Sequence, residues 1–314
     1  MKLIEKDYFS KEQFNIHYAE IQSDAPHGTI PLVLIHGQCM CFGDYESVFE
    51  ALSERYHIFA VDCPGHGKSE KNAELYTCEK IGNLLCEFIE KVIGEPCIVS
   101  GHSSGGILAA YIAGQIPTMV KGLLLEDPPF FNVEPGEVEN TFVYKDGFQL
   151  YHNYINQSEE KDFMPYYLEH SYIFGIFGKK FQEKTAAEAR AYMQAHPGEE
   201  LKLEKIKEAS LHGYKYINAF DFLFAESFYT GSWFDGVNQE LILKSVKCPV
   251  VYLKAKTKYG PKKVLWAANT NQSSDRMLSL LENAKRIVVR SGHDIHYEKP
   301  KEFLKAMDAL ALRI

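Results

Sequence analysis

The chain has 314 residues, of which 46% are hydrophobic and 24% are charged, and its formal net charge is −8. This length allows one large domain, or a core domain that carries a smaller inserted one. The acidic balance disfavours a nucleic-acid partner, and no stretch approaches the ~18 apolar residues of a membrane span.

The N-terminus and the cysteines favour a cytoplasmic protein. Charges interrupt the apolar residues between Met1 and Asp7, so this segment does not have the pattern of a signal peptide. The seven cysteines form no CxxC pair, which predicts neither a zinc site nor a disulfide framework. We therefore expect no cofactor and no metal, and the sequence leaves a homodimer open.

Short apolar runs alternate with helical patterns along the first third of the chain. The runs predict strands over residues 14–21, 32–35, 57–61, 97–100 and 120–125. Helical patterns cover residues 44–55 and 104–116. Thr77 could cap a further helix, which carries the apolar residues Ile81, Leu84, Leu85, Phe88 and Val92. Such alternation indicates parallel strands joined by helical crossovers, and continuous apolar runs indicate strands that are covered on both faces.

This alternation stops between residues 130 and 245, where tyrosine and phenylalanine are frequent and a charged helical pattern covers residues 179–195. It then resumes, with strands expected over 249–253 and 286–290 and helices over 275–283 and 300–312. We predict an α/β fold, in which a mostly parallel central sheet is sandwiched by helices. The core would comprise residues 1–129 and 246–314, and residues 130–245 would form an inserted helical cap.

The run from Gly101 to Gly105, Gly-His-Ser-Ser-Gly, lies between the predicted strand 97–100 and the predicted helix 104–116. A serine on such a tight strand-to-helix turn has an exposed hydroxyl beside a helix N-terminus, which favours negative charge. The turn leaves little room on either side, which explains glycine two residues before and two after Ser103. Ser103 is therefore the candidate nucleophile, and a glycine-rich turn without catalysis is the alternative.

Four segments occur in an order and at a spacing that resemble the α/β-hydrolase superfamily. They are His36-Gly37-Gln38, residues 62–69, residues 101–105 and Ser291-Gly292-His293. The resemblance covers the predicted core, about two thirds of the chain. It implies an α/β-hydrolase fold and a serine hydrolase with a Ser-His-acid triad.

The resemblance also implies roles for individual residues. His293 matches the triad histidine that follows the last core strand, with His296 as the rival three residues later. The oxyanion hole would use the backbone N–H groups of Ser104, which follows the nucleophile, and of Gln38, which follows His-Gly.

The acidic residue of the implied triad does not stand where most members of the family carry it. Lys258 stands where many members carry an aspartate, and a lysine would oppose an imidazolium rather than stabilise it. A second arrangement in the superfamily places the acid after the strand that precedes the cap, where Glu126 and Asp127 stand. Because adjacent strand residues point to opposite faces, only one of the two can readily reach the histidine. Our choice is Asp127, with Glu126 and Asp275 as alternatives.

These features predict a serine hydrolase that cleaves a carboxylic ester, thioester or lactone of an apolar small molecule through an acyl-enzyme intermediate. The aromatic segment 130–245 suggests the apolar substrate. A serine nucleophile disfavours the epoxide-hydrolase and haloalkane-dehalogenase branches, and Asp294 after the histidine disfavours the hydroxynitrile-lyase branch. Carbon–carbon bond hydrolysis, acyl transfer and non-catalytic ligand binding remain as alternatives.

Overall fold

The computed structural model describes residues 1–22, 29–204, 206 and 211–314. These residues form one eight-stranded sheet with the order β1-β2-β4-β3-β5-β6-β7-β8. The strands are β1 (Lys2–Phe9), β2 (Asn15–Gln22), β3 (Ile30–Ile35), β4 (Tyr56–Val61), β5 (Cys97–His102), β6 (Val120–Glu126), β7 (Val250–Ala255) and β8 (Ala284–Val289). The pairings of β2 with β1 and with β4 are antiparallel, and the other pairings are parallel. The predicted mostly parallel sheet is therefore confirmed.

Each strand that the apolar runs predicted is present, with small shifts at its ends. Strand β1 was not predicted. It lies at the edge of the sheet, and most of its side chains are exposed. Three of its first five residues, Lys2, Glu5 and Lys6, are charged and interrupt any apolar pattern. An edge strand of this kind gives no continuous apolar run in the sequence.

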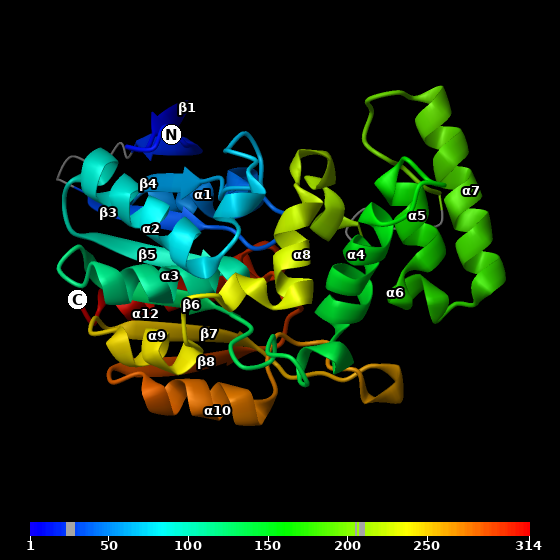
Figure 1. Cartoon of the computed structure of the whole chain (residues 1–314). Coiled ribbons are helices and arrows are strands. Elements are labelled where there is room, and N and C mark those ends of the chain that lie inside the picture. The colour runs from blue at the N-terminus through cyan, green and yellow to red at the C-terminus, as the bar shows by residue number, and fades with distance from the viewer. Residues whose placement is uncertain (23–28, 205, 207–210) are drawn as a thin grey trace.

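Helices cover both faces of the sheet (Figure 1). One face carries α1 (Glu46–Ser53) and α12 (Pro300–Ala311), and the other carries α2 (Cys78–Phe88), α3 (Ser104–Gln115), α9 (Gln239–Ser245) and α10 (Asn271–Leu280). The Thr77 hydroxyl accepts a hydrogen bond from the N–H of Lys80, so it caps α2 as predicted. Helix α10 begins earlier than the predicted residue 275, because Thr270 caps it by accepting from the N–H of Ser273.

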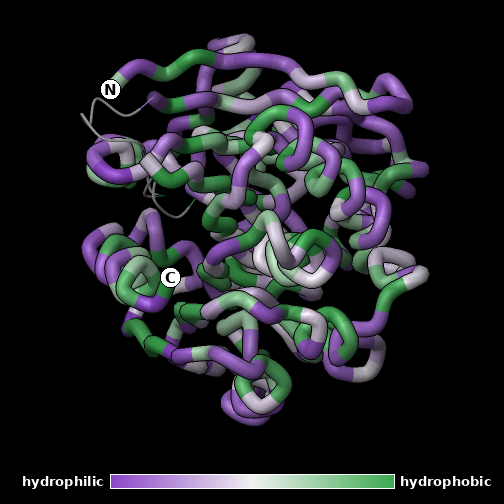
Figure 2. Tube along the Cα trace, turned by 90° about the vertical axis from the view of Figure 1, so that its left-hand side faces the viewer, coloured by the Kyte–Doolittle hydropathy of each residue, from purple (hydrophilic) through white to green (hydrophobic). Residues whose placement is uncertain are grey.

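The two faces of the sheet bury two separate apolar clusters. Along β3, Val33 and Ile35 belong to one cluster, whereas Leu32 and Leu34 belong to the other. This follows from strand geometry, in which successive side chains point to opposite faces. Figure 2 shows hydrophobic and hydrophilic positions alternating along much of the trace. The continuous apolar runs of the sequence are thus explained by burial on both faces.

Between β6 and β7 the chain forms the helices α4 (Gln149–Ile155), α5 (Phe163–His170), α6 (Tyr172–Gly175), α7 (Lys179–Ala195) and α8 (Phe222–Thr230) before α9. Helix α7 has the predicted bounds. In Figure 1 the helices α4 to α8 lie beyond one end of the sheet, whereas α9 lies beside α10. The division into a core and a cap at residues 129/130 and 245/246 stays a prediction, and residues 23–28, 205 and 207–210 of those ranges lie outside the described residues.

None of the helices in the described part of the chain combines the length and the apolar character that crossing a bilayer requires.

Candidate active site

A cavity of about 640 Å³ lies where the chain leaves the carboxyl ends of the parallel strands. Its lining includes a residue that follows each of β3, β5, β6, β7 and β8, respectively Gln38, Ser103, Pro129, Ala267 and His293. The rest of the lining comes largely from the segment between β6 and β7. Parallel α/β sheets commonly bind ligands at this edge, so the cavity is the candidate active site.

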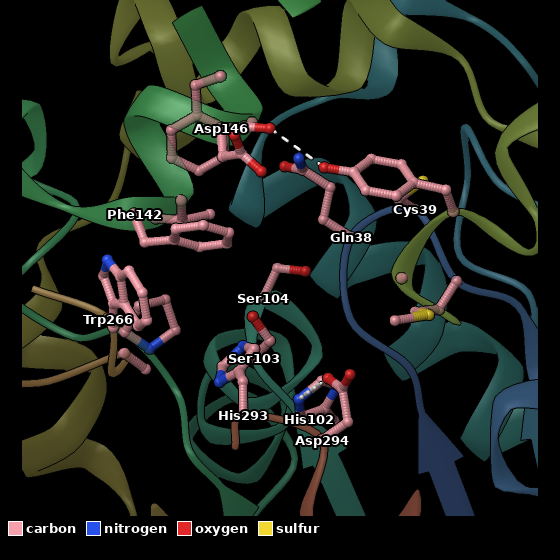
Figure 3. A pocket seen from close by; sticks show the side chains of 18 of the residues that line it. Gln38, Cys39, His102, Ser103, Ser104, Phe142, Asp146, Trp266, His293 and Asp294 are labelled. Carbon is pink, nitrogen blue, oxygen red and sulfur yellow. Dashed lines mark hydrogen bonds and ion pairs between the residues drawn. The ribbon is translucent and has the colours of Figure 1, made fainter. Parts of the chain in front are cut away.

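Ser103 lies at the turn between β5 and α3, and its backbone has φ 54° and ψ −121°. A positive φ is costly for a residue other than glycine, and it persists only where the surroundings impose it. Here the Ser103 N–H donates to the carbonyl of Glu126 at 2.9 Å, and the Ser103 carbonyl accepts from the N–H of Gly106 at 2.9 Å. The turn therefore points the hydroxyl into the cavity, as Figure 3 shows.

The two motif glycines are required by close backbone contacts. A Cβ on Gly101 would lie 2.1 Å from the carbonyl oxygen of Gly105, and a Cβ on Gly105 would lie 2.3 Å from the carbonyl oxygens of Ile35 and His36. Both separations are shorter than any van der Waals contact. The sequence pattern of glycines around Ser103 thus has a steric cause: β3, β5 and α3 meet here with no room for a side chain.

His293 and Asp127 form a hydrogen-bonded pair beside the serine. The His293 Nδ1–H donates to Asp127 Oδ2 at 2.8 Å, and Figure 3 shows the His293 and Ser103 side chains pointing toward one another. Desolvation alone would lower the pKa of His293, but the hydrogen bond and the charge of Asp127 outweigh it and raise that pKa to about 9. The pair can therefore hold an imidazolium.

Asp127 is held rigidly for this contact. Its side chain is fully buried, and its backbone has a positive φ of 42° just beyond the end of β6. The Asp127 N–H donates to the carbonyl of Leu253 at 2.8 Å, and Asp127 Oδ1 accepts from the N–H of Ala255 at 3.0 Å. Strand β7 thus fixes one carboxylate oxygen and leaves the other for His293.

The alternative residues that the sequence left open lie elsewhere. Lys258 lies over the Trp266 ring, with Nζ 5.1 Å from the ring centroid. Asp275 is on α10 and contacts Arg286, with 2.5 Å between Oδ1 and Nη1. Glu126 points away from Asp127, as expected for neighbouring strand residues, and contacts His296 instead.

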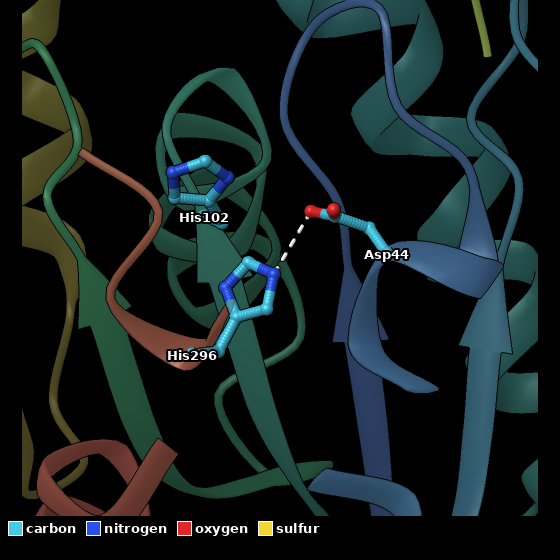
Figure 4. Close-up of side chains that lie close together, drawn as sticks. All are labelled: Asp44, His102 and His296. Atoms are coloured by element: carbon cyan, nitrogen blue, oxygen red, sulfur yellow. Dashed lines mark hydrogen bonds and ion pairs between the residues drawn. The ribbon is translucent and has the colours of Figure 1, made fainter. Parts of the chain in front are cut away.

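His296 lies between two carboxylates and is fully buried (Figure 4). Its Nδ1–H donates to Glu126 at 2.9 Å, and its Nε2–H donates to Asp44 Oδ2 at 2.9 Å. Burial alone would lower the pKa of His296, but Glu126 and Asp44 raise it well above its ordinary value. His296 is therefore an imidazolium at neutral pH, and no nitrogen of its ring remains for the cavity.

Asp44, His102 and His296 are the described residues whose side chains could together hold a metal ion, with ligand atoms within 4.8 Å of one another. A metal would need His296 Nε2, which already contacts the Asp44 carboxylate at 2.9 Å. The ring of His102 lies between those of His293 and His296, with centroids 4.6 Å and 5.2 Å away in tilted and edge-on contacts. Burial, and the charge of His293, lower the pKa of His102 to about 3, so this ring is neutral. The contacts are those of an ion-paired network.

Two backbone donors face the same cavity. Gln38 and Ser104 both line it, and within the described part of the chain neither of their N–H groups donates to a protein acceptor. His36 shapes the turn before Gln38, because its Nε2 accepts from the N–H of Cys63 at 3.0 Å and its Nδ1–H donates to the carbonyl of Gly37 at 2.7 Å. Free N–H groups at such a turn suit an anionic oxygen.

Sequence analysis did not single out several cavity residues. Asp146 and His212 contribute charged or titratable groups, and His212 Nε2 lies 3.1 Å from Asp44 Oδ1. Asp294, which the sequence had marked only as the residue after His293, lines the cavity as well. Asp146 and His212 come from the segment between β6 and β7, and no motif marks them. The sequence gives one signal for Asp146, which is a carboxylate among aromatic residues between Phe142 and Phe148. If these aromatic residues are buried, the aspartate is buried with them, and a buried charge is uncommon without a partner.

Comparison with known proteins gives a family match over most of the chain. Residues 32–306 match the model of the alpha/beta hydrolase family. Carboxylesterase CesB from Bacillus subtilis has a similar solved structure, with a TM-score of 0.64 and 16% identity, covering 99% of this chain and 92% of that one. At that identity the likeness concerns the fold.

Two curated relatives match shorter regions. An uncharacterized hydrolase, YugF, from Bacillus subtilis is 28% identical over 118 residues, which are 37% of this chain and 42% of that protein. The pimeloyl-acyl-carrier-protein methyl ester esterase of Nitrosospira multiformis is 32% identical over 110 residues, which are 34% of this chain and 40% of that protein. The chain thus spans less than half the length of these two relatives.

Proposed function

The chain belongs to the α/β-hydrolase family, and we propose that it hydrolyses a carboxylic ester, thioester or lactone of an apolar small molecule through an acyl-enzyme intermediate. One observation carries the proposal. Ser103, on its strained turn, and His293, paired with the buried Asp127, open into one cavity lined mainly by apolar and aromatic side chains. Esterases among the relatives and structural neighbours support this class of reaction.

In this proposal each residue has a defined role. The Ser103 Oγ attacks the carbonyl carbon while His293 accepts its proton, and Asp127 stabilises the imidazolium. The N–H groups of Gln38 and Ser104 donate to the oxyanion of the tetrahedral intermediate. His293 then gives the proton to the leaving oxygen or sulfur, and a water molecule, deprotonated by the same histidine, releases the acid from Ser103.

The test is labelling with a fluorophosphonate probe, which reacts with activated serines. The wild-type protein should be labelled, and the Ser103→Ala variant should not, because it lacks the nucleophilic oxygen. Ser104→Ala is the matched control, since its backbone N–H and the neighbouring hydroxyl of Ser103 remain; it should keep the label. Absence of labelling of the wild type at any pH would favour a non-catalytic ligand-binding protein.

A chain-length series of p-nitrophenyl esters, together with small lactones, would then report the reaction and the size of the acyl site. Hydrolysis of these compounds distinguishes an esterase from a carbon–carbon bond hydrolase, which would leave them intact while Ser103 is still labelled. Acyl transfer would appear as an ester of an added alcohol rather than as free acid.

We also propose that the protein works in the cytoplasm. All seven cysteines are free thiols, and a reducing compartment preserves that state. Six of the cysteines are buried, and burial raises the pKa of their thiols, for example to about 12 for Cys39. These thiols are therefore unreactive in the folded protein.

A further inference from the structure

Asp146 is a buried carboxylate in the cavity wall without a cationic partner. It lies on the short π-helix η5 (Tyr144–Phe148), and its side chain lines the cavity although the residue is only 1% exposed. Its Oδ2 accepts from the Tyr167 O–H at 2.8 Å, and its Oδ1 accepts from the N–H of Ile173 at 3.0 Å. Both donors are neutral, and no lysine, arginine or histidine of the described residues forms an ion pair with Asp146.

Buried charges in proteins are normally paired, because an unpaired ion loses its hydration without compensation. Burial raises the pKa of Asp146 to about 6, and the N–H of Ile173, the O–H of Tyr167 and the N–H of Tyr172 oppose that rise. The group is therefore still largely ionised at neutral pH. A carboxylate has about four positions for hydrogen-bond donors, and Ile173, Tyr167 and Tyr172 together occupy at most three of them. The remaining capacity lies at the wall of a cavity of about 640 Å³.

Besides the backbone N–H donors and His293 near Ser103, the cavity wall carries further hydrogen-bond acceptors. Gln38 Oε1 is buried and has no hydrogen-bond donor within the described residues. Asp294 and Glu298 add two further carboxylates to the lining. Among the described lining residues no lysine or arginine offers a positive charge to an anionic ligand.

Aromatic rings complete the surroundings of Asp146. Phe142, Phe148, Tyr167 and Tyr214 line the same cavity, and the rings of Tyr167 and Tyr214 lie 4.1 Å apart. The face of an aromatic ring attracts a cation, so these rings suit an ammonium group near the carboxylate. In Figure 3 Asp146 lies on the side of the cavity away from Ser103 and His293.

We propose that the substrate is an ester that carries an ammonium group, and that Asp146 binds this group while the carbonyl lies at Ser103. The placement of the carbonyl at Ser103 rests on the proposed ester hydrolysis, whereas binding of the ammonium group by Asp146 does not depend on it. Gln38 Oε1 and the aromatic rings provide further contacts for the N–H donors and for the alkyl part.

The competing explanation is that Asp146 serves the fold alone. Its contact with the N–H of Ile173 ties the start of α6 to η5, and its contact with Tyr167 ties α5 to the same point. A purely structural role would lower the turnover of all substrates together when Asp146 is changed. A binding role would instead lower the ratio of kcat/KM for a cationic substrate to kcat/KM for a neutral substrate.

The experiment uses three ethyl esters of matched length: those of 6-aminohexanoic acid and heptanoic acid, and the monoester of pimelic acid. Homologues with two more and two fewer methylene groups cover different distances between the carbonyl and the charge. Release of the acid gives kcat/KM for each. The 6-amino compound or one of its homologues should exceed its neutral counterpart by about tenfold, as expected for one hydrogen-bonded charge pair, and the anionic ester should be the poorest substrate.

The Asp146→Asn variant preserves the size of the side chain and removes its charge, so this ratio should fall to about one. Asp221→Asn is the control, because Asp221 also accepts from a tyrosine, Tyr76, but lies outside the cavity; it should keep the wild-type ratio. Preference for the pimelic monoester, or a ratio that Asp146→Asn leaves unchanged, would overturn the proposal.

Calorimetric binding to the Ser103→Ala variant separates this inference from the proposed function. If no ester is hydrolysed by the wild type but ethyl 6-aminohexanoate still binds about tenfold more tightly than ethyl heptanoate, the cationic site stands and ester hydrolysis fails. If both esters bind equally and the wild type hydrolyses both, the cationic site fails and ester hydrolysis stands.

Discussion

At the scale of single residues, the hydrogen bond between His293 and Asp127 has a consequence for the pH dependence of the proposed reaction. A base must be neutral to accept the proton of Ser103, and the pKa of His293 is raised to about 9. Below that pH the imidazolium predominates in the free protein. Activity should therefore be limited by deprotonation of His293 well into the alkaline range.

We predict that kcat/KM of the wild type rises with pH and levels off near pH 9. In Asp127→Asn the rising limb should move to lower pH, since the charge that raises the pKa of His293 is gone. The plateau itself should fall by roughly 10³- to 10⁴-fold, because the imidazole loses its orientation. Steady-state kinetics from pH 5 to about pH 10, which spans the ordinary and the raised pKa of a histidine, would measure both changes.

The far-UV circular dichroism of Asp127→Asn should match that of the wild type. Asp275→Asn is the matched comparison, because Asp275 contacts Arg286 on the outside of the sheet and should be dispensable. Near-normal activity of Asp127→Asn beside an inactive Asp275→Asn would reverse the assignment of the acid.

At the scale of elements, the end of β6 explains why two adjacent acids can both matter. Asp127 contacts His293 beside the cavity, and Glu126 contacts His296 on the buried side. The alternation of strand side chains predicts this division. The partner of Glu126 could not be predicted, because His296 lies 170 residues further along the chain and the two meet only in the folded protein.

The same contrast holds for the elements themselves. Strands β3 to β7 were predictable because burial on both faces gives continuous apolar runs. The edge strand β8 is only partly buried but keeps the apolar run Ile287-Val288-Val289, whereas the charged edge strand β1 has no such run. Ser103 and His293 were predictable because steric and catalytic demands fix their neighbours in the sequence. Asp146 was not, since its environment is made by α5, α6 and η5 together.

We predict that Glu126→Gln lowers the free energy of unfolding by about 3–5 kcal/mol, because it leaves the buried imidazolium of His296 with a single carboxylate. The pKa of His296 is raised in the folded state. Its contribution is therefore complete below the unfolded value, about 6.5, and is lost as the pH rises through the folded value. The difference between wild type and variant should accordingly narrow at high pH.

Urea denaturation at several pH values would measure this difference. Asp308→Asn is a suitable control, since Asp308 forms an exposed ion pair with Arg55 and should cost no more than about 1 kcal/mol. A destabilisation by Glu126→Gln that is the same at every pH would mean that His296 is neutral in the folded protein.

At the scale of the whole molecule, the segment between β6 and β7 and the sheet share one apolar cluster. Phe224 and Trp233 of that segment belong to the same cluster as Val33, Val99 and Leu108. The Tyr76 O–H also donates to Asp221 at 2.7 Å across the boundary. Because one continuous apolar cluster joins the segment and the sheet, the two parts should unfold together.

The two tryptophans of the chain test this expectation, since Trp233 lies between β6 and β7 and Trp266 follows β7. We predict that Trp266→Phe and Trp233→Phe, which each leave one tryptophan, give fluorescence midpoints in urea that coincide with the far-UV circular dichroism midpoint of the same variant. Separate transitions within one variant would show that the helices α4 to α8 unfold independently of the sheet.

The adjacency of β6 and β7 has a consequence for how such a protein can diversify. The two strands pair directly, from Leu123 with Val250 to Glu126 with Leu253, although more than a hundred residues separate them in the chain. Closing a flexible loop costs only about 0.6 kcal/mol more for each doubling of its length. The length of the segment therefore adds little to the cost of pairing the two strands, provided that an exchanged segment again covers the apolar cluster that it shares with the sheet. Exchange of the segment between β6 and β7 would change the cavity wall and leave the sheet unchanged. This segment is therefore where a change of substrate specificity should be introduced.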